Sequence, residues 1–218
     1  MFRWLEAMMD IAEIVGTLAF AASGAMIAID RELDLFGVLF LGISAAVGGG
    51  MIRDVLLGVT PPGAFSHPVY VGMAALTALI VFLFAWRRQS QYRRQYTRLD
   101  HVVNLLDALG LGVFGVIGVE AAMAAGHADN PFLCVFMGMT TGVGGGILRD
   151  ILSHAVPMVL KKRIYAVAVI VGSLAYSLLR RTQLAMLVCM ILGTAVTVAI
   201  RLCSTRYRWD LPVVRLEK

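Results

Sequence analysis

Residues 45–54 of this chain read AAVGGGMIRD, and residues 141–150 read TGVGGGILRD, so the pattern returns 96 positions later (Gly48 to Gly144). Both copies lie inside long apolar runs. Three consecutive glycines weaken a helix by about 1 kcal/mol each relative to alanine, and the following Arg-Asp pair is costly in a bilayer. Two copies in register indicate a duplicated unit with a polar pathway, and they predict a membrane protein that passes small solutes or ions.

The composition supports the membrane class. Of the 218 residues, 59% are hydrophobic and 15% are charged, whereas a soluble domain carries about 25% charged residues. The net charge of +5 does not indicate nucleic acid, because the basic residues gather at the ends of apolar runs, as the positive-inside rule requires. The three cysteines have no metal-ligand spacing and are interpreted as buried thiols.

Seven apolar runs are long enough to be candidate membrane spans, since about 20 residues cross the hydrocarbon core. Their length favours helices, because strands of a membrane barrel alternate over about ten residues. The sequence therefore predicts an all-α integral membrane protein in one membrane domain, residues 1–218. The predicted spans are residues 11–29, 35–57, 69–86, 102–125, 132–152, 164–179 and 184–200.

The duplication extends beyond the glycine motif, since Gly16, Phe20 and Gly24 recur 94 positions later as Gly110, Phe114 and Gly118. The unit is thus three helices, predicted over residues 11–87 and 102–180. An odd number of crossings inserts the second copy upside down, which is the inverted-repeat architecture with a pathway between the halves. A seventh helix at 184–203 and a cytoplasmic tail at 204–218 complete the prediction.

Lysine and arginine counts set the expected orientation. The basic residues gather in residues 87–98, in residues 161–163 and in the tail, which seven spans place on one side. The N-terminus is therefore predicted outside and the C-terminus in the cytoplasm. Arg180 and Arg181 are the one pair on the wrong side. The basic loops are also candidate contacts for anionic lipid.

The triple glycines are interpreted as breaks in the second and fifth spans. A broken span is tolerated where it lines a wet cavity, and its freed carbonyls can replace a cation's hydration shell. Helix N-termini at the same break would favour anions, and small residues at every fourth position also suit plain helix packing. The predicted pathway residues are Gly48, Gly49, Gly50, Gly144, Gly145 and Gly146, with the hydroxyls of Ser44, Thr140 and Thr141.

The charged residues of the motif need partners. Neighbours on a helix diverge by about 100°, so Arg53 is not expected to pair with Asp54, nor Arg149 with Asp150. Two cross-helix pairs are predicted instead, Glu13–Arg53 and Asp107–Arg149, one near each mouth of the pathway. They would gate it or only fix helix register, and Asp54 and Asp150 would remain free to attract cations or to bond the broken backbone.

Glu120 is a further intramembrane carboxylate, and its repeat counterpart is Met26. Such a residue suggests a functional group, although an interfacial position explains it equally well. The chain contains no phosphate loop, metal-ligand cluster or nucleophile elbow, so neither an enzyme nor a bound cofactor is expected.

The two Gly-Gly-Gly-x-x-Arg-Asp motifs, with the three-span repeats and a seventh span, resemble those of the prokaryotic trimeric intracellular cation (TRIC) channels. Bacterial members of this family have also been described as glycine transporters. The resemblance covers about residues 11–200. It implies a bacterial inner-membrane homotrimer that conducts K⁺ and Na⁺ through a pore in each subunit, lined by spans one, two, four and five. The lipid cofactor of the animal members is not carried over, because their motif differs.

Two functions in different classes of transport remain open from the sequence. The leading hypothesis is a passive channel for monovalent cations, which bind only transiently near the glycines. The alternative is a carrier for glycine or another small zwitterion, whose carboxylate a helix N-terminus would bind. A purely structural membrane protein would leave the paired motifs unexplained.

Overall fold

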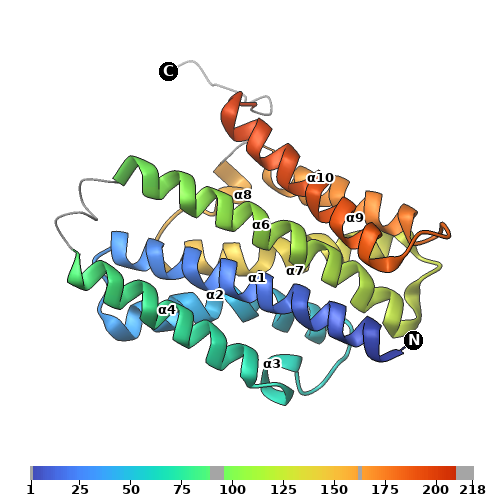
Figure 1. Ribbon diagram of the computed structural model, residues 1–218, viewed down its shortest axis with the longest axis horizontal. Coiled ribbons are helices and arrows are strands. Elements are labelled where there is room, and N and C mark those ends of the chain that lie inside the picture. The colour runs from blue at the N-terminus through green and yellow to red at the C-terminus, as the bar shows by residue number, and fades with distance from the viewer. Residues whose placement is uncertain (1, 89–95, 162–163, 210–218) are drawn as a thin grey trace, which may run out of the picture.

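A computed structural model describes residues 2–88, 96–161 and 164–209 of the chain, and all regular structure in these ranges is helical (Figure 1). The predicted all-α class is confirmed for this part of the protein. The helices are α1 (Phe2–Asp30), α2 (Leu35–Leu56), α3 (Gly63–Ser66), α4 (Val69–Arg87), α6 (Tyr96–Ala122), the short π-helix η1 (Met123–His127), α7 (Pro131–Leu152), α8 (Met158–Lys161), α9 (Tyr165–Leu179) and α10 (Met186–Arg206).

Six of these helices are long and apolar enough to cross a membrane: α1, α2, α4, α6, α7 and α10. Helix α9 is also apolar but has only 15 residues, or about 22 Å. The crossing predicted for residues 164–179, which would bring the number to seven, therefore stays a prediction. The last predicted span, residues 184–200, ends before the helix does, because α10 runs from Met186 to Arg206 and so includes Arg201 and the first residues of the predicted tail. Residues 210–218 of that tail, and the basic residues Arg93, Arg94, Lys162 and Arg163, lie outside the described ranges.

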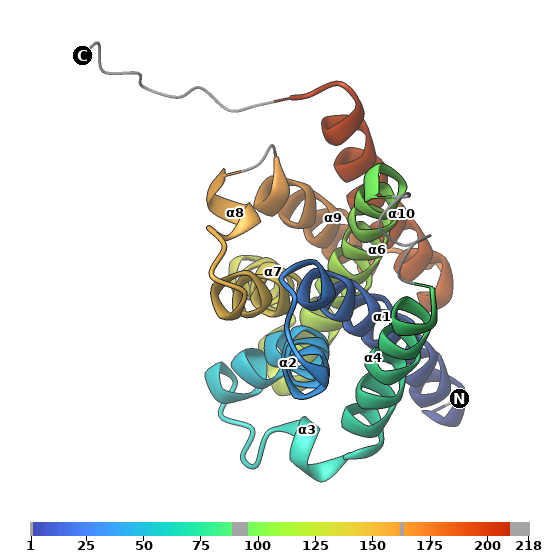
Figure 2. The ribbon, with the colours of Figure 1, turned by 90° about the vertical axis from the view of Figure 1, so that its left-hand side faces the viewer.

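The helices pack as two sets of three. Helices α1, α2 and α4 contact one another, as do α6, α7 and α9 (Figures 1 and 2). The two sets meet through the pairs α1–α6 and α2–α7, and α10 packs against α9 and α6. Each half of the sequence therefore builds its own three-helix unit, and α10 joins only the second.

Helices α2 and α7 begin and end in the same way. The side chain of Asp34 accepts a hydrogen bond from the Gly37 N–H at 2.8 Å, and the side chain of Asn130, 96 positions later, accepts one from Leu133 N–H at 3.0 Å. Such N-caps satisfy backbone donors that the first helical turn leaves open. At the C-terminal end of each helix, the backbone carbonyl of the motif aspartate accepts a hydrogen bond from the N–H five residues later. The pairs are Asp54 with Val59 and Asp150 with Ala155.

The triple glycines do not break their helices, so this prediction is wrong. Helices α2 and α7 run without interruption through Gly48–Gly50 and Gly144–Gly146. The glycines instead let the two helices touch: a methyl group on Gly49 would collide with the carbonyl oxygen of Thr141, and one on Gly145 with that of Ala45. The local cost of glycine in a helix is thus offset by backbone-to-backbone packing between helices.

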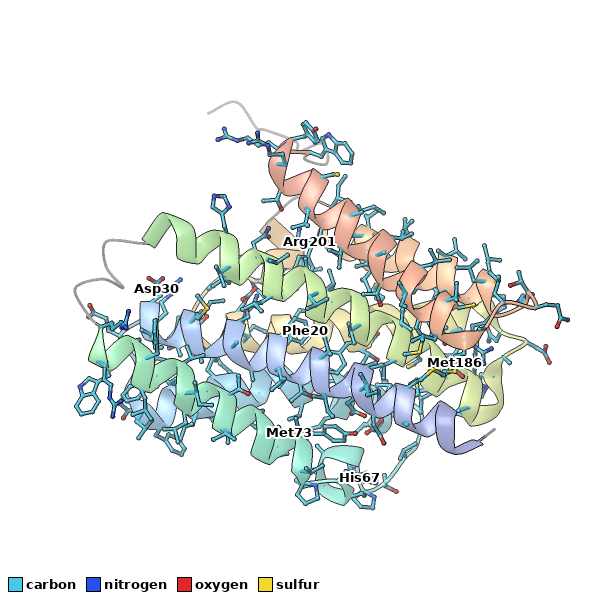
Figure 3. The ribbon with its side chains drawn as sticks, in the orientation of Figure 1. Phe20, Asp30, His67, Met73, Met186 and Arg201 are labelled. Atoms are coloured by element: carbon cyan, nitrogen blue, oxygen red, sulfur yellow. The ribbon has the colours of Figure 1, made fainter. Side chains whose placement is uncertain are left out.

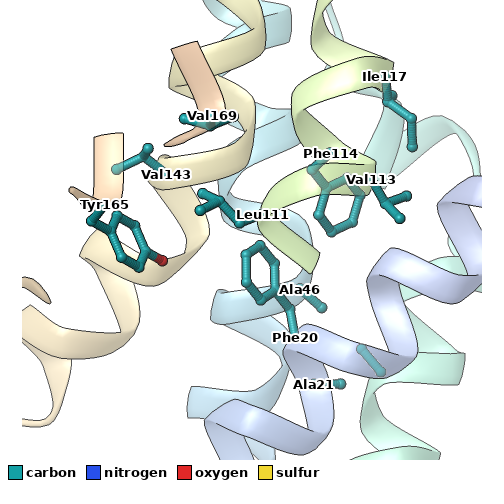
Figure 4. Packing of buried hydrophobic residues seen from close by; sticks show 11 residues of the cluster. Phe20, Ala21, Ala46, Leu111, Val113, Phe114, Ile117, Val143, Tyr165 and Val169 are labelled. Atoms are coloured by element: carbon teal, nitrogen blue, oxygen red, sulfur yellow. The ribbon is translucent and has the colours of Figure 1, made fainter. Parts of the chain in front are cut away.

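These contacts are reciprocal between equivalent positions. Residues 45 and 49 of α2 face residues 145 and 141 of α7, so the two helices cross antiparallel. Gly16 of α1 likewise lies against the Phe114 ring and Gly110 of α6 against the Phe20 ring. The two rings stack with centroids 5.5 Å apart in the buried core (Figure 4). Reciprocal contacts of this kind are typical of a two-fold relationship between two copies.

Candidate functional site

A cluster of buried charge lies beyond the glycine crossing, where α7 approaches α6 and α1. The Arg149 guanidinium donates from Nη1 to Asp107 Oδ1 at 2.7 Å and to Ser23 Oγ at 2.9 Å. Its Nε donates to Asp150 Oδ1 at 3.0 Å. The side chains of Arg149 and Asp107 are both fully buried. Buried charges require this kind of pairing, since an isolated one costs several kcal/mol.

Two further residues complete this second-half cluster. The Tyr165 hydroxyl donates to Asp107 Oδ1 at 3.2 Å. Arg201 of α10 lies 3.9 Å from Asp107 Oδ2 by its Nη2 atom, and the same atom donates to Asn104 Oδ1 at 3.2 Å. Its guanidinium also lies over the Tyr165 ring, 4.6 Å from the centroid. Figure 3 labels Arg201 on α10, where this helix packs against α6.

The first half carries an equivalent but more open cluster. Arg53 donates from Nε to Asp54 Oδ1 at 2.8 Å, and the Tyr70 hydroxyl donates to Asp10 Oδ1 at 3.1 Å. Glu13 lies within electrostatic reach of Arg53, Asp54 and Asp10. The Arg53 side chain is 12% exposed, against 0% for Arg149, and Asp10 is exposed. This first-half cluster is therefore closer to the surface.

Matching backbone contacts fix both aspartates of the motif. Asp54 Oδ2 accepts a hydrogen bond from the Gly63 N–H at 2.7 Å, and Asp150 Oδ2 accepts one from the Met158 N–H, also at 2.7 Å. Each carboxylate thus ties the end of its helix to the short helix that follows, α3 or α8. Neither is free to attract cations as the sequence suggested.

The predicted ion pairs have different outcomes. The Asp107–Arg149 pair is confirmed, whereas no ion pair joins Glu13 to Arg53 among the residues that the structure describes. The expectation that neighbours in the motif do not pair is wrong at both sites, since Arg53 lies 2.7 Å from Asp54 and Arg149 lies 2.9 Å from Asp150. The Cβ atoms of neighbouring helical residues point about 100° apart, but the arginine side chain is long enough to bend back to the carboxylate of the next residue.

The predicted pathway residues are mostly buried by packing. Five of the six motif glycines are buried and Gly50 is half-buried. Thr141 is also buried and donates to the carbonyl of Met137 at 2.6 Å, within its own helix. Ser44 and Thr140, which are equivalent positions, are half-buried. The contact of these residues with a permeant solute remains a prediction.

Glu120 has partners that the sequence did not identify. Its carboxylate accepts two hydrogen bonds from Arg180, at 3.0 and 3.1 Å, and one from the Tyr176 hydroxyl at 2.7 Å. These hydrogen bonds raise the pKa of Arg180 above its ordinary value. The arginine that contradicted the orientation count is thus held in an ion pair between α6 and α9.

Sequence reasoning missed the roles of Tyr70, Asn104, Tyr165 and Arg201. The repeat offset could have found three of them, because Asp10 aligns with Asn104 and Tyr70 with Tyr165 beside the charged positions. No repeat offset points to Arg201, because it lies outside the repeats. An arginine at the end of an apolar run is also what the positive-inside rule predicts, so its position did not suggest a further role.

Comparison with known proteins gives the same division of the chain. The family model described as "Glycine transporter" matches residues 10–86 and 104–181. The UPF0126 inner membrane protein YadS of Escherichia coli (strain K12) is 38% identical over 208 residues, which cover 94% of this chain and 96% of the relative.

Solved structures agree along nearly the whole length. A TRIC cation channel studied for its conductance is 36% identical, with a TM-score of 0.82 and coverage of 96% of this chain and 98% of that one. The TRIC trimeric intracellular cation channel orthologue from Rhodobacter sphaeroides is 32% identical, with a TM-score of 0.81 and coverage of 92% and 98%. Similarity of sequence and of fold along both repeats shows that this chain belongs to the TRIC channel family, matched by the "Glycine transporter" family model.

Proposed function

We propose that the chain is a passive channel for the monovalent cations K⁺ and Na⁺, with one pore in each subunit of a homotrimer. The observation that carries the proposal is the pair of charge clusters on opposite sides of the α2–α7 crossing. Because these helices are antiparallel, Arg53 and Arg149 lie beyond opposite sides of the glycine contact. Similar structures are described as cation channels, and one of them as trimeric.

The repeats are proposed to be inverted with respect to the membrane. The antiparallel crossings of α2 with α7 and of α1 with α6 support this arrangement, in which α9 is the short sixth span and α10 is the seventh. The pore then runs between the halves and is lined by α1, α2, α6 and α7. Ser44 and Thr140 line it together with Gly50, the half-buried glycine of the two motifs. The glycine crossing is its narrowest level, since the backbones touch there.

The charges favour cations over anions. The first-half cluster has three carboxylates, those of Asp10, Glu13 and Asp54, against the guanidinium of Arg53. The second-half cluster has two carboxylates and two guanidiniums, which balance. Counted over their described residues, neither cluster carries net positive charge, so a cation meets the lower electrostatic barrier.

Location in the bacterial inner membrane agrees with the six apolar helices and with the relative described as an inner membrane protein. The N-terminus is proposed outside and the C-terminus in the cytoplasm. Arg180, one of the two basic residues on the wrong side of this scheme, is tied to Glu120 in an ion pair. No catalytic step is proposed, since the related proteins are described as channels or transporters.

A carrier for glycine is the alternative function, because the matching family model has that description. A zwitterion would need a guanidinium and a carboxylate side by side, as the half-buried Arg53 and Glu13 could provide.

The two functions differ in flux. Purified protein in planar bilayers should give unitary currents whose reversal potential follows the K⁺ gradient and not the Cl⁻ gradient. Proteoliposomes loaded with glycine test the carrier: saturable glycine counterflow without unitary current would replace the channel by the alternative. Empty vesicles and vesicles holding an unrelated membrane protein are the controls.

A further inference from the structure

The cluster around Asp107 contains one residue from outside the repeats. Arg201 belongs to α10, which follows the second matched segment, residues 104–181. Within residues 2–88, 96–161 and 164–209, the first half has no helix equivalent to α10 beside Glu13, the counterpart of Asp107. The two halves therefore differ by one buried guanidinium.

The contact between Arg201 and Asp107 is an ion pair without a hydrogen bond. Nη2 of Arg201 lies 3.9 Å from Asp107 Oδ2, and the two side chains are 2% and 0% exposed. That oxygen accepts no hydrogen bond from any residue in the described part of the chain. The hydrogen bonds that Asp107 accepts from Arg149 and Tyr165 both go to Oδ1. Oδ2 is thus a buried, charged acceptor whose positive neighbour is held by the Tyr165 ring and Asn104.

The repeat also differs at the adjacent position. Asp10 in the first half aligns with Asn104 in the second, 94 positions later, as Glu13 aligns with Asp107. The first-half cluster keeps the extra carboxylate and, among the residues whose structure is described, has no second guanidinium. The second-half cluster replaces that carboxylate by an amide and adds Arg201. Both changes make the second mouth less negative.

We propose that Arg201 is a tethered cation, which holds the place beside Asp107 Oδ2 that a permeant monovalent cation would otherwise take. It sets the cation conductance of the second mouth and makes the two mouths unequal. This inference rests on the channel function proposed above. A guanidinium beside the carboxylate excludes a mobile cation by charge and by volume, so displacement of Arg201, or its loss, opens that position.

The experiment compares Arg201→Gln with the wild-type protein in planar bilayers under symmetric KCl. Removal of this buried charge should raise the cation current roughly threefold or more, because local cation concentration follows the local potential. It should also reduce the rectification that unequal mouths produce. Arg201→Lys, which keeps the charge, should stay close to wild type. Arg206→Gln is the matched control: it removes the same charge from an exposed position of the same helix.

A second variant covers the case in which Arg201→Gln does not assemble. Asn104→Asp restores the carboxylate present at Asp10 and keeps Arg201, and it should raise the current in the same direction. Unchanged current and unchanged rectification in an assembled Arg201→Gln or Asn104→Asp trimer would overturn the inference.

Crystals soaked in Tl⁺ give a readout that does not depend on flux. An anomalous peak beside Asp107 Oδ2 in Arg201→Gln, and none there in wild type, supports the tethered cation; no peak in either protein contradicts it. Failure of the channel function is recognised separately, as a wild-type protein that carries no cation current.

Discussion

Phe20 of α1 and Phe114 of α6 hold equivalent positions in the two repeats, and their rings stack with centroids 5.5 Å apart. A residue that contacts its own counterpart lies next to the axis that relates the two copies. Gly16 and Gly110 lie next to the same axis, since Gly16 packs against the Phe114 ring and Gly110 against the Phe20 ring. The α1–α6 contact at this axis is therefore packed apolar surface, and the charge clusters lie on either side of it.

The glycine crossing should be intolerant of a single methyl group. Gly49→Ala or Gly145→Ala places a Cβ against a backbone carbonyl of the other helix, so the helices must separate. Overpacking of this kind costs about 1–3 kcal/mol, and we expect a lower melting temperature of the detergent-solubilised protein. Gly72→Ala in α4 is the control, because its Cβ meets nothing within 4 Å. A Gly49→Ala protein as stable as wild type would contradict the packing role.

Loss of Arg149 should destabilise the protein far more than loss of Arg53. Arg149→Gln leaves Asp107 as a buried carboxylate with less compensation, at a cost of about 3–5 kcal/mol, whereas Arg53 is partly exposed. Thermal unfolding in detergent measures the difference. The double variant Asp107→Asn/Arg149→Gln should recover part of the stability, because it removes both charges. Equal losses for the two single variants would show that burial does not distinguish the clusters.

The Glu120–Arg180 pair should contribute to stability and not to conduction. Both side chains are partly exposed, so a double-mutant cycle with Glu120→Gln and Arg180→Gln should give a coupling of about 1 kcal/mol or less. The cation current of each variant should equal that of wild type. A change in ion selectivity in either variant would move this pair into the conduction pathway.

The negative charge of the first-half cluster should support cation entry. Glu13→Gln removes one carboxylate beside Arg53, and we expect a lower K⁺ current at low ionic strength, with a smaller effect at high salt because of screening. Asp129→Asn is the control, since it removes an exposed charge on the same side in the proposed orientation. Equal reductions in both variants would assign the effect to general surface charge.

The role of the glycines shows where prediction from sequence failed. The cost of three glycines in a row is a local quantity, and by itself it favours a break in the helix. The contact of Gly49 with the Thr141 carbonyl is not local, because it depends on which helix approaches and at what crossing point. The same limitation hid Arg201, whose environment is made by α6 and α9 rather than by its neighbours in the chain.

The sequence alone determined the membrane class, six of the apolar helices and the duplication, because hydrophobic length and a repeat offset are properties of the linear chain. It also placed the Asp107–Arg149 pair, since the repeat aligns Asp107 with Glu13, 94 positions apart, and the expected topology directs Arg149 toward that carboxylate. Tertiary structure decided that the glycines join two continuous helices, that each arginine pairs with its neighbour and that α10 adds a charge to one half only. These outcomes depend on close approach between distant segments, which no local pattern encodes.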